Sequence, residues 1–417
     1  MMEERTLIVG LYLSNDNTQL SVLNRTLYEP EDVYQTEAKT AQIPTVLTLA
    51  KDTSHWYYGE EARNYIVNKE GRLIKNFMFS KVNSFMVYDT EITREALVKK
   101  FIRSVLLLLK REFPNDSIKM LVVTIKQTSP ENILLLYQVL EELGLYKDRV
   151  RIVSHQLSFM YYALSQKKEL WMNDVSLFDF DENGLQYYQI TMDRRQRPCL
   201  ARLLKKDFTE TLSYDMIKEN EENTGYVFEQ IVNTRLFKQI ISTIYLTGVG
   251  FEEPWIKPYL SKLCTGRRVF IGQNLFCYGA CYAAKELSGE QKLEDIVPIS
   301  DDTIDCTITT PVYVDGEIKE IVLAKLGSPW YEVNCSFDLI PDRETGMVLT
   351  VRNAFTKELS HHSIPLIDDE QRRNKTIRYR FELCCISRNT VSVTVKDIGF
   401  GQMYPGTDQI FEQRITI

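Results

Sequence analysis

Apolar runs that end in short polar or glycine-rich turns recur in the first part of the chain. Three of them share one order, an apolar β-rich run and then a turn of small or polar residues, at Leu7–Thr18, Val175–Gly184 and Ser242–Phe251. In the first two the apolar run resumes after the turn, which predicts β-hairpins with tips at Ser14–Asn17 and Asp181–Gly184.

The third run, Thr243–Thr247, leads into the glycine turn Gly248–Gly250. Glycine carries no Cβ and accepts positive φ, so such a turn can present bare backbone amides to a ligand. An ordinary strand-to-helix connection is the alternative explanation, and it is the favoured one when the turn is considered alone. Because the pattern occurs three times, we expect the three turns to converge on one crevice at the carboxyl ends of sheet strands.

Helix and strand patterns alternate between these turns. Apolar residues at helical spacing predict a helix over Glu91–Glu112, and the β-branched run Ile118–Ile125 predicts a strand that is covered on both faces. Ser129 and Pro130 predict an N-cap and a first helical position for a helix that ends at Gly144. Two further helices are predicted over Tyr226–Ile241 and, with small residues for close packing, over Leu275–Leu287.

The pattern changes near Ser288–Asp302. From Asp305 to Ile417 helical periods stop and short alternating strands follow, which predicts a β-sandwich. We therefore predict an α/β domain over 1–290, with lobes at about 1–165 and 166–290, and a second domain over 303–417.

Composition narrows the classes of function. The 417 residues are 44% apolar and 26% charged, as in ordinary globular proteins, and the net charge of −7 with no long basic run argues against a nucleic-acid partner. Eight scattered cysteines without a C-x-x-C pair, and only four histidines, disfavour a zinc site and a disulfide framework. No apolar signal segment or membrane-length run is present, so we expect a cytoplasmic protein with free thiols and no membrane partner.

The order of these segments resembles the actin, hexokinase and heat-shock ATPase superfamily, and the late strand-rich part resembles the seventy-kilodalton heat-shock chaperones in particular. The resemblance covers nearly the whole chain and rests on the order of its motifs. The matching segments are Val9–Leu13, Ile43–Thr45 with Gly59–Ala62, Leu246–Pro254, Tyr278–Ala280 and Arg414–Ile417.

The resemblance implies a duplicated, ribonuclease H-like ATPase fold followed by a substrate-binding β-sandwich without a helical lid. It also implies a crevice for ATP or ADP with magnesium. The span Met192–Tyr226 is too short for the family's second upper subdomain, so we expect that subdomain to be reduced.

The chain departs from the family at the phosphate strands. The family's first strand carries Asp-Leu-Gly-Thr-Thr, whose carboxylate organises magnesium, whereas the aligned residues here are Tyr12–Asp16. In the second phosphate strand Asp179 remains, but Asp181 and Glu182 stand where the family has glycines. A triphosphate would meet like charge there unless a cation intervenes.

Two further family residues are missing. The family's catalytic Glu-Pro falls on Gln156–Leu157, and the arginine that stacks on adenine falls on Glu252. We therefore expect a weak nucleotide site that a divalent cation would strengthen.

Two classes of function remain open. The favoured one is a lapsed, chaperone-like pseudo-ATPase that acts as a scaffold for a protein or peptide partner and is not an enzyme. The alternative is an active ATP-hydrolysing chaperone-like enzyme, in which Asp16 and Asp179 are catalytic and jointly hold magnesium; a sugar or acetate kinase is a distant third, because those lack such a sandwich. The candidate nucleotide-binding residues are Ser14, Asn15, Asp16, Asn17, Asp179, Gly184, Gly248 and Gly250. For Asp16 and Glu182 taken singly, a solvated hairpin tip is the favoured explanation.

Overall fold

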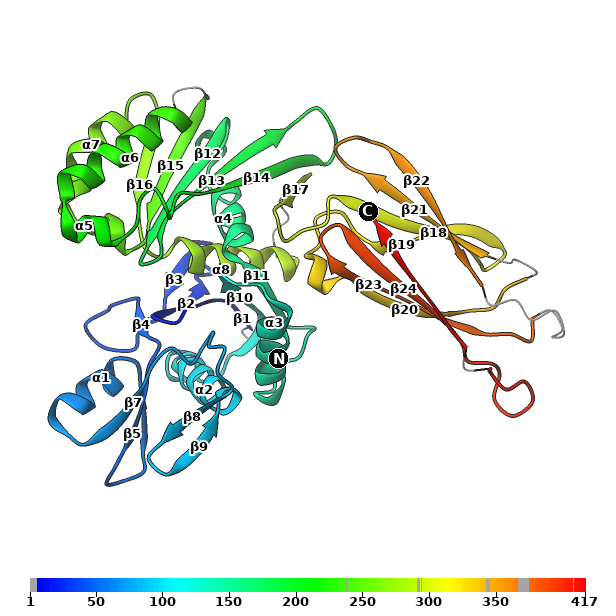
Figure 1. Cartoon of the computed structure of the whole chain (residues 1–417), viewed down its shortest axis with the longest axis horizontal. Coiled ribbons are helices and arrows are strands. Elements are labelled where there is room, and N and C mark those ends of the chain that lie inside the picture. The colour runs from blue at the N-terminus through cyan, green and yellow to red at the C-terminus, as the bar shows by residue number, and fades with distance from the viewer. Residues whose placement is uncertain are drawn as a thin grey trace. The chain divides into compact units, whose positions relative to one another are not determined.

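The computed structural model describes residues 6–236, 239–290, 293, 295–342, 346–366, 375–407 and 409–417. The chain forms two compact units, the N-terminal unit Met1–Pro298 and the C-terminal unit Ile299–Ile417 (Figure 1). Within the described residues, no helix combines the length and the apolar character needed to cross a membrane.

The first sheet of the N-terminal unit has the strand order β11-β10-β1-β2-β3, with β4 also paired to β2. β1 (Thr6–Leu13), β2 (Asn17–Leu23) and β3 (Pro30–Asp32) are antiparallel in succession. β10 (Ser117–Ile125) and β11 (Val150–Ser154) lie on the other side of β1 and run parallel to it. The predicted first hairpin and the predicted buried strand Ile118–Ile125, which corresponds to β10, are confirmed.

The second sheet has the order β16-β15-β12-β13-β14-β17. β12 (Asp174–Asp181), β13 (Gly184–Asp193) and β14 (Cys199–Asp207) are antiparallel in succession, whereas β15 (Ile241–Thr247) and β16 (Arg268–Ile271) run parallel to β12. β17 (Ile296–Ile299) lies at the β14 edge. The sequence pattern did not predict β14, because most of its second half is exposed and does not alternate.

The two sheets repeat one topology. In each, three antiparallel strands are followed by two parallel strands on the far side of the first strand. The helices repeat as well: α2 (Arg94–Glu112), α3 (Pro130–Glu142) and α4 (His155–Leu164) in the first half correspond in order to α6 (Glu221–Leu236), α7 (Lys257–Leu263) and α8 (Leu275–Leu287) in the second. The N-terminal unit is therefore an internally duplicated mixed α/β arrangement.

Insertions distinguish the two halves. Between β3 and α2 the first half adds β4 (Ile43–Pro44), β5 (Leu47–Ala50), β6 (Trp56–Tyr58), α1 (Gly59–Asn68), β7 (Gly71–Ile74), β8 (Ser84–Val87) and β9 (Thr90–Thr93). The second half adds α5 (Asp215–Glu219) before α6. It also adds the short turns η2 (Val249–Phe251) and η3 (Pro254–Ile256) before α7. The turn η1 (Lys168–Leu170) precedes β12. The second half thus has the smaller insertion.

Local capping explains where several helices begin. The Ser129 hydroxyl accepts a hydrogen bond from the Asn132 amide, and α3 starts at Pro130 as predicted. The prediction for α6 was wrong at both ends: the helix begins at Glu221, and Ile241 is already the first residue of β15. Residues 237 and 238, which the prediction also included, lie outside the described residues.

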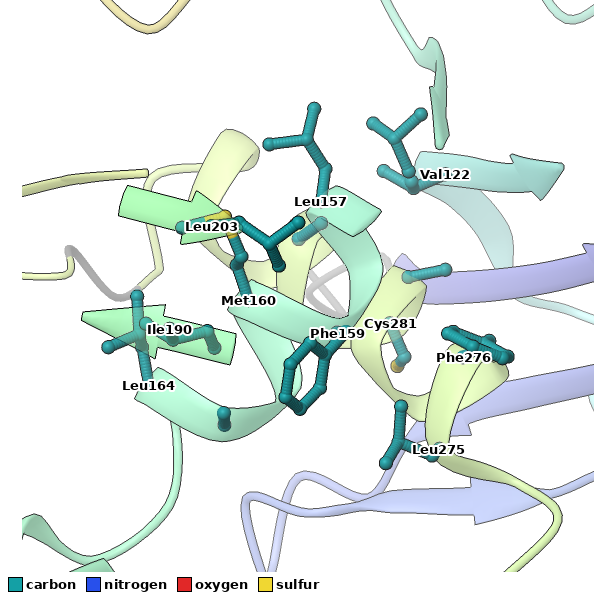
Figure 2. Packing of buried hydrophobic residues seen from close by; sticks show 14 of the residues in the cluster. Val122, Leu157, Phe159, Met160, Leu164, Ile190, Leu203, Leu275, Phe276 and Cys281 are labelled. Atoms are coloured by element: carbon teal, nitrogen blue, oxygen red, sulfur yellow. The ribbon is translucent and has the colours of Figure 1, made fainter. Parts of the chain in front are cut away.

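Helices α4 and α8 pack against each other in the middle of the N-terminal unit (Figure 2). A Cβ on Gly279 would lie 2.0 Å from the carbonyl oxygen of Ser158, so only glycine permits this approach. The close packing that was predicted for the helix Leu275–Leu287, α8, is confirmed. Figure 2 shows its partners in the core, among them Leu157, Phe159, Met160 and Leu164 of α4, Leu275, Phe276 and Cys281 of α8, and Val122 of β10.

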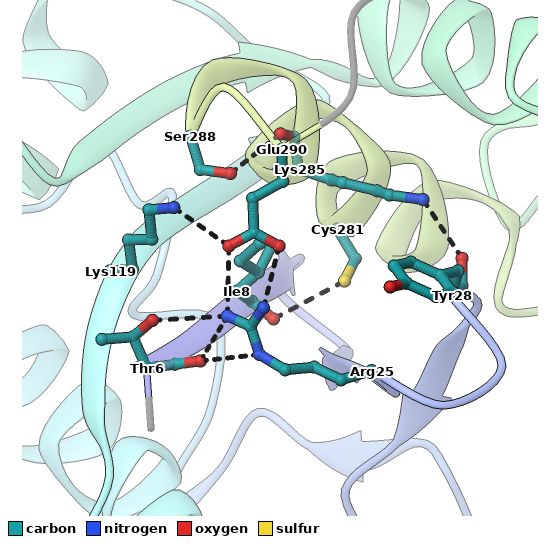
Figure 3. Close-up of polar contacts among 9 residues, drawn as sticks. All are labelled: Thr6, Ile8, Arg25, Tyr28, Lys119, Cys281, Lys285, Ser288 and Glu290. Atoms are coloured by element: carbon teal, nitrogen blue, oxygen red, sulfur yellow. Dashed lines mark hydrogen bonds and ion pairs between the residues drawn. The ribbon is translucent and has the colours of Figure 1, made fainter. Parts of the chain in front are cut away.

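A polar cluster fixes the segment after α8 to the amino ends of β1 and β10 (Figure 3). The Glu290 carboxylate accepts hydrogen bonds from Arg25 at 3.0 and 3.1 Å and from Lys119 at 3.0 Å. Burial alone would raise the pKa of Glu290, but the two cations lower it by more than burial raises it, so the net shift is downward. The Lys285 ammonium lies 5.3 Å from the centre of the Tyr28 ring and donates to the Tyr28 carbonyl.

The C-terminal unit contains two four-stranded antiparallel sheets, ordered β19-β18-β21-β22 and β20-β23-β24-β25. The strands are β18 (Cys306–Val314), β19 (Glu317–Ala324), β20 (Asn334–Leu339), β21 (Gly346–Asn353), β22 (Leu359–Pro365), β23 (Tyr379–Ser387), β24 (Thr390–Asp397) and β25 (Ile410–Thr416), with the turn η4 (Trp330–Glu332) before β20. Side chains from both sheets, including Ile308, Leu349, Phe381 and Val393, share one core. β22 was not predicted, because Ile364 is its one buried side chain.

Candidate functional site

A cavity of about 250 Å³ lies in the N-terminal unit where strands of both sheets end. Its walls come from the β1–β2 tip, the residues after β10 and β11, the β12–β13 tip and the turn after β15, and α8 closes it. The lining residues are Tyr12, Leu13, Ser14, Asn15, Asp16, Asn17, Gln19, Gln42, Phe79, Lys126, Gln127, His155, Asp179, Asp181, Glu182, Asn183, Thr247, Gly248, Val249, Gln273 and Phe276.

The structure brings six of the eight predicted nucleotide-binding residues to this cavity: Ser14, Asn15, Asp16, Asn17, Asp179 and Gly248. Gly184 and Gly250 are not among its lining residues. A Cβ on Gly184 would meet Thr209, and a Cβ on Gly250 would meet the Phe180 ring, so both glycines serve internal packing. Asp16 and Asp179 line the same cavity, but the described part of the chain holds no group of three or more His, Cys, Asp or Glu side chains arranged for a metal ion.

The first hairpin tip uses its polar groups within itself. The Ser14 hydroxyl accepts from the Asn17 amide at 3.0 Å and from the Asp16 amide at 3.3 Å. The Asn15 side-chain oxygen accepts from the Phe79 amide at 3.0 Å. The amides of Asp16 and Asn17 at this tip are therefore engaged, as in Asx- and Ser-rich turns generally.

The glycine turn is also engaged. The Gly248 amide donates to the Gln273 side-chain oxygen at 3.0 Å, and the Gln273 side-chain nitrogen donates back to the Gly248 carbonyl at 3.1 Å. Gly248 has a φ of 97°, and a Cβ there would lie 2.3 Å from the Phe180 carbonyl oxygen. The expectation that this turn offers a bare amide was wrong for Gly248, whose glycine is required by the backbone beside it.

The hairpin tip of β12 and β13 pairs with a lysine that the sequence analysis did not select. Lys126, the residue after β10, forms an ion pair with the Asp181 carboxylate. Burial lowers the pKa of Lys126, but the carboxylates of Asp179 and Asp181 outweigh it, and the net shift is upward. Asp181 also accepts from the Asn183 amide at 2.9 Å, so its carboxylate has partners both within its own turn and after β10.

Asp179 differs from the other acids, because its side chain is 5% exposed. Burial raises the pKa of this carboxyl to about 7; Asp181 adds to the rise, and Lys126 and Lys205 oppose it. No described residue donates a hydrogen bond to it. Asp179 is therefore a buried acid that only the neighbouring charges compensate.

Three rings lie side by side along one wall. His155 stacks on Phe276 at 4.3 Å between ring centres and on Tyr12 at 5.0 Å. The His155 side chain is buried, neither of its ring nitrogens has a hydrogen-bond partner among the described residues, and burial lowers its pKa well below the usual value. His155 is therefore neutral and supplies no positive charge to the cavity.

Sequence reasoning missed Lys126, His155 and Gln273. For Lys126 a usable signal existed, because it directly follows the predicted strand Ile118–Ile125, and side chains at the carboxyl ends of parallel strands meet at one edge of a sheet. His155 occupies the same position after the observed strand β11. Gln273 gave no such signal, because its partner Gly248 is far away in the sequence.

Comparison with known families gives two matches. The model described as "Family of unknown function (DUF5716) C-terminal" matches residues 29–301, and the model described as "Domain of unknown function (DUF8552)" matches residues 303–417. No curated protein matches the chain.

Proposed function

For this chain, which belongs to the family of unknown function DUF5716, we propose the role of a chaperone-like scaffold. In this role the N-terminal unit is an actin-like, ribonuclease H-like ATPase fold whose nucleotide site no longer hydrolyses ATP. The C-terminal unit, a β-sandwich, holds a protein or peptide partner, and the protein acts in the cytoplasm.

The repeated topology of the N-terminal unit supports the fold proposed. Both sheets have three antiparallel strands and then two parallel strands on the far side of the first. Such a duplication, with a crevice at the strand ends of both halves, is the arrangement expected from the resemblance to heat-shock ATPases.

The chemistry of the cavity is the observation that carries the loss of hydrolysis. Phosphoryl transfer requires cations and backbone amides that face the transferred phosphate. Here the Lys126 ammonium is paired with Asp181, and the Gly248 amide is bound to Gln273. His155 is neutral, so it supplies no replacement charge.

An exposed edge strand supports the proposal that the C-terminal unit binds a peptide partner. Among the described strands β19 pairs with β18 on one side only, and its first six residues, Glu317–Val322, are all exposed. Ile318 is 76% exposed and Val322 56% exposed, and Tyr313 is also exposed on the adjoining strand. An unpaired edge with apolar side chains can add an extended peptide as a further strand.

ATP turnover tests the proposal. The full-length chain is incubated with ATP and magnesium, and phosphate release is compared with that in buffer alone. We expect equal rates. Turnover that disappears in Asp179→Asn, with the fold retained by circular dichroism, would instead support the alternative enzyme, in which Asp16 and Asp179 line the active cavity together.

A further inference from the structure

We infer that the cavity of the N-terminal unit binds a cationic nitrogen group, an ammonium or a guanidinium, in place of a phosphate. The inference deepens the proposed function, because it assumes that this cavity has lost its ATPase role, and it names the chemistry of what the cavity now takes. A free diamine and a lysine or arginine side chain of a partner both carry this chemistry.

The charges of the lining favour a cation. Four carboxyl groups line the cavity, those of Asp16, Asp179, Asp181 and Glu182, and among the described lining residues Lys126 is their only cationic counterpart. Its ammonium is already paired with Asp181. The remaining acids have no ammonium or guanidinium of their own within hydrogen-bonding distance in the described part of the lining.

Two buried groups that line the cavity are hydrogen-bond acceptors without a donor. Gln19 is 3% exposed, and its side-chain nitrogen donates to the Gln273 carbonyl at 3.1 Å, which fixes the orientation of the amide. Its side-chain oxygen accepts no hydrogen bond from a described residue. The buried Asp179 carboxylate likewise receives none. Because an unsatisfied buried acceptor is costly, a ligand rich in N–H donors would be stabilised here.

Several backbone donors at the cavity are already in use. The amides of Asp16 and Asn17 donate to Ser14, the Gly248 amide donates to Gln273, and the Asn183 amide donates to Asp181. A phosphate could therefore use these amides only by breaking existing bonds, whereas a cation would add a bond to the Gln19 side-chain oxygen, which lacks a donor among the described residues.

Size agrees with this class of ligand. The cavity of about 250 Å³ has room for an ammonium or guanidinium group. A cation beside Asp179 would also favour its ionised form, which burial disfavours.

The test uses calorimetric titration of the full chain with three probes. They are agmatine, the blocked peptide acetyl-Gly-Arg-Gly-amide, and the same peptide with citrulline, which is neutral and has the shape of arginine. We expect one or both cationic probes to bind, and any arginine peptide that binds to do so at least tenfold more tightly than its citrulline counterpart. Binding of agmatine alone assigns the site to free amines, and binding of the peptide assigns it to a partner's side chain.

Two variants and one control distinguish a loss of binding at the site from a loss of the fold. Asp179→Asn keeps the shape of the side chain and should weaken the cationic probe at least tenfold, and Glu182→Gln at the exposed tip should weaken it severalfold. Glu141→Gln removes one charge from an exposed position on α3 outside the cavity and should leave binding unchanged. Circular dichroism and thermal melting confirm that each variant is folded.

Proton linkage provides an independent readout. Asp179 is faced by Lys126, Asp181 and Lys205, and Tyr12 and His155 line the same cavity. A cation that binds the ionised carboxylate should release protons near neutral pH, seen as buffer-dependent binding heat, and should bind more tightly as pH rises; Asp179→Asn should abolish both effects.

Three results would overturn the inference: neither cationic probe binds, Asp179→Asn leaves their affinity unchanged, or inorganic triphosphate or magnesium alone binds more tightly than agmatine in a manner that depends on Asp179. Turnover of ATP is measured separately. Absence of both agmatine and peptide binding without ATP turnover refutes this inference alone, whereas ATP turnover lost in Asp179→Asn refutes the proposed function.

Discussion

Gln273 binds Gly248 through both backbone groups of the glycine, with its side-chain oxygen 3.0 Å from the Gly248 nitrogen and its side-chain nitrogen 3.1 Å from the Gly248 oxygen. This amide-to-backbone pair joins the end of β15 to the segment before α8. Because the Gln273 carbonyl also accepts from Gln19 at 3.1 Å, the same residue links the two halves of the N-terminal unit.

Removing this pair should destabilise the N-terminal unit. We expect Gln273→Leu to lower the free energy of unfolding by about 1–2 kcal/mol, because two hydrogen bonds are lost and the Gly248 amide is left without an acceptor. Urea denaturation followed by circular dichroism measures the change. Gln42→Leu is the matched control, because Gln42 lines the same cavity and makes no hydrogen bond to a described residue; an equal loss in both variants would contradict the role of the pair.

Gly248 should tolerate a methyl group less well than another glycine with positive φ. Gly144 has a φ of 82° and open space around it, whereas a Cβ on Gly248 would collide with the Phe180 backbone. We expect Gly144→Ala to cost about 1 kcal/mol of unfolding free energy from backbone strain alone, and Gly248→Ala about 2 kcal/mol more. Thermal melts of both variants provide the comparison, and equal costs would show that the collision is relieved by local movement.

Asp179 should make stability depend on pH. Its pKa is about 7 in the folded chain and near 3.8 when unfolded, so between these values the folded state holds more protons than the unfolded state. Stability from this group is therefore present below pH 4 and is lost as pH rises toward 7. Asp179→Asn should become more stable relative to the natural chain from pH 4 to pH 8, as measured by urea denaturation at several pH values. A stability difference that does not change with pH would refute the shift.

The edge strand β19 should be the site of peptide pairing. Phage display on the full chain provides an extended peptide as the probe. We expect the double variant Ile318→Lys with Val322→Lys to weaken its binding at least tenfold, because charged side chains on an edge oppose strand addition.

Leu359→Lys on β22, the other edge of the same sheet, is the control and should bind as the natural chain does. Equal loss in both would contradict a site at β19. Sedimentation showing a dimer that dissociates in the double variant would assign the edge to a second copy of the chain.

Local chemistry made part of this structure predictable. Ser14–Asn17 forms a turn because serine and asparagine bond to their own backbone, and α3 begins at Pro130 because Ser129 caps it. Both features depend on neighbours within a few residues, which the sequence displays directly.

The remainder depends on contacts between distant segments. Lys126 meets Asp181 only because β10 and β12 end at one cavity, and Gly248 is bound because a side chain from the segment before α8 reaches it. The end of α6 was misplaced for a related reason: Ile241 continued the apolar helical pattern, but its pairing with Asp174 of β12 places it in β15.

The contact between Gly279 and Ser158 has a mechanical consequence for the N-terminal unit. α4 belongs to the first half and α8 to the second, so the halves meet where one backbone rests on another without an intervening side chain. The two backbones cannot approach more closely at this contact, but it can act as a pivot point for a rotation of one half relative to the other. Because the cavity takes its walls from both halves, any rotation of one half about this contact would change the separation of Gln19 on β2 and Asp179 on β12.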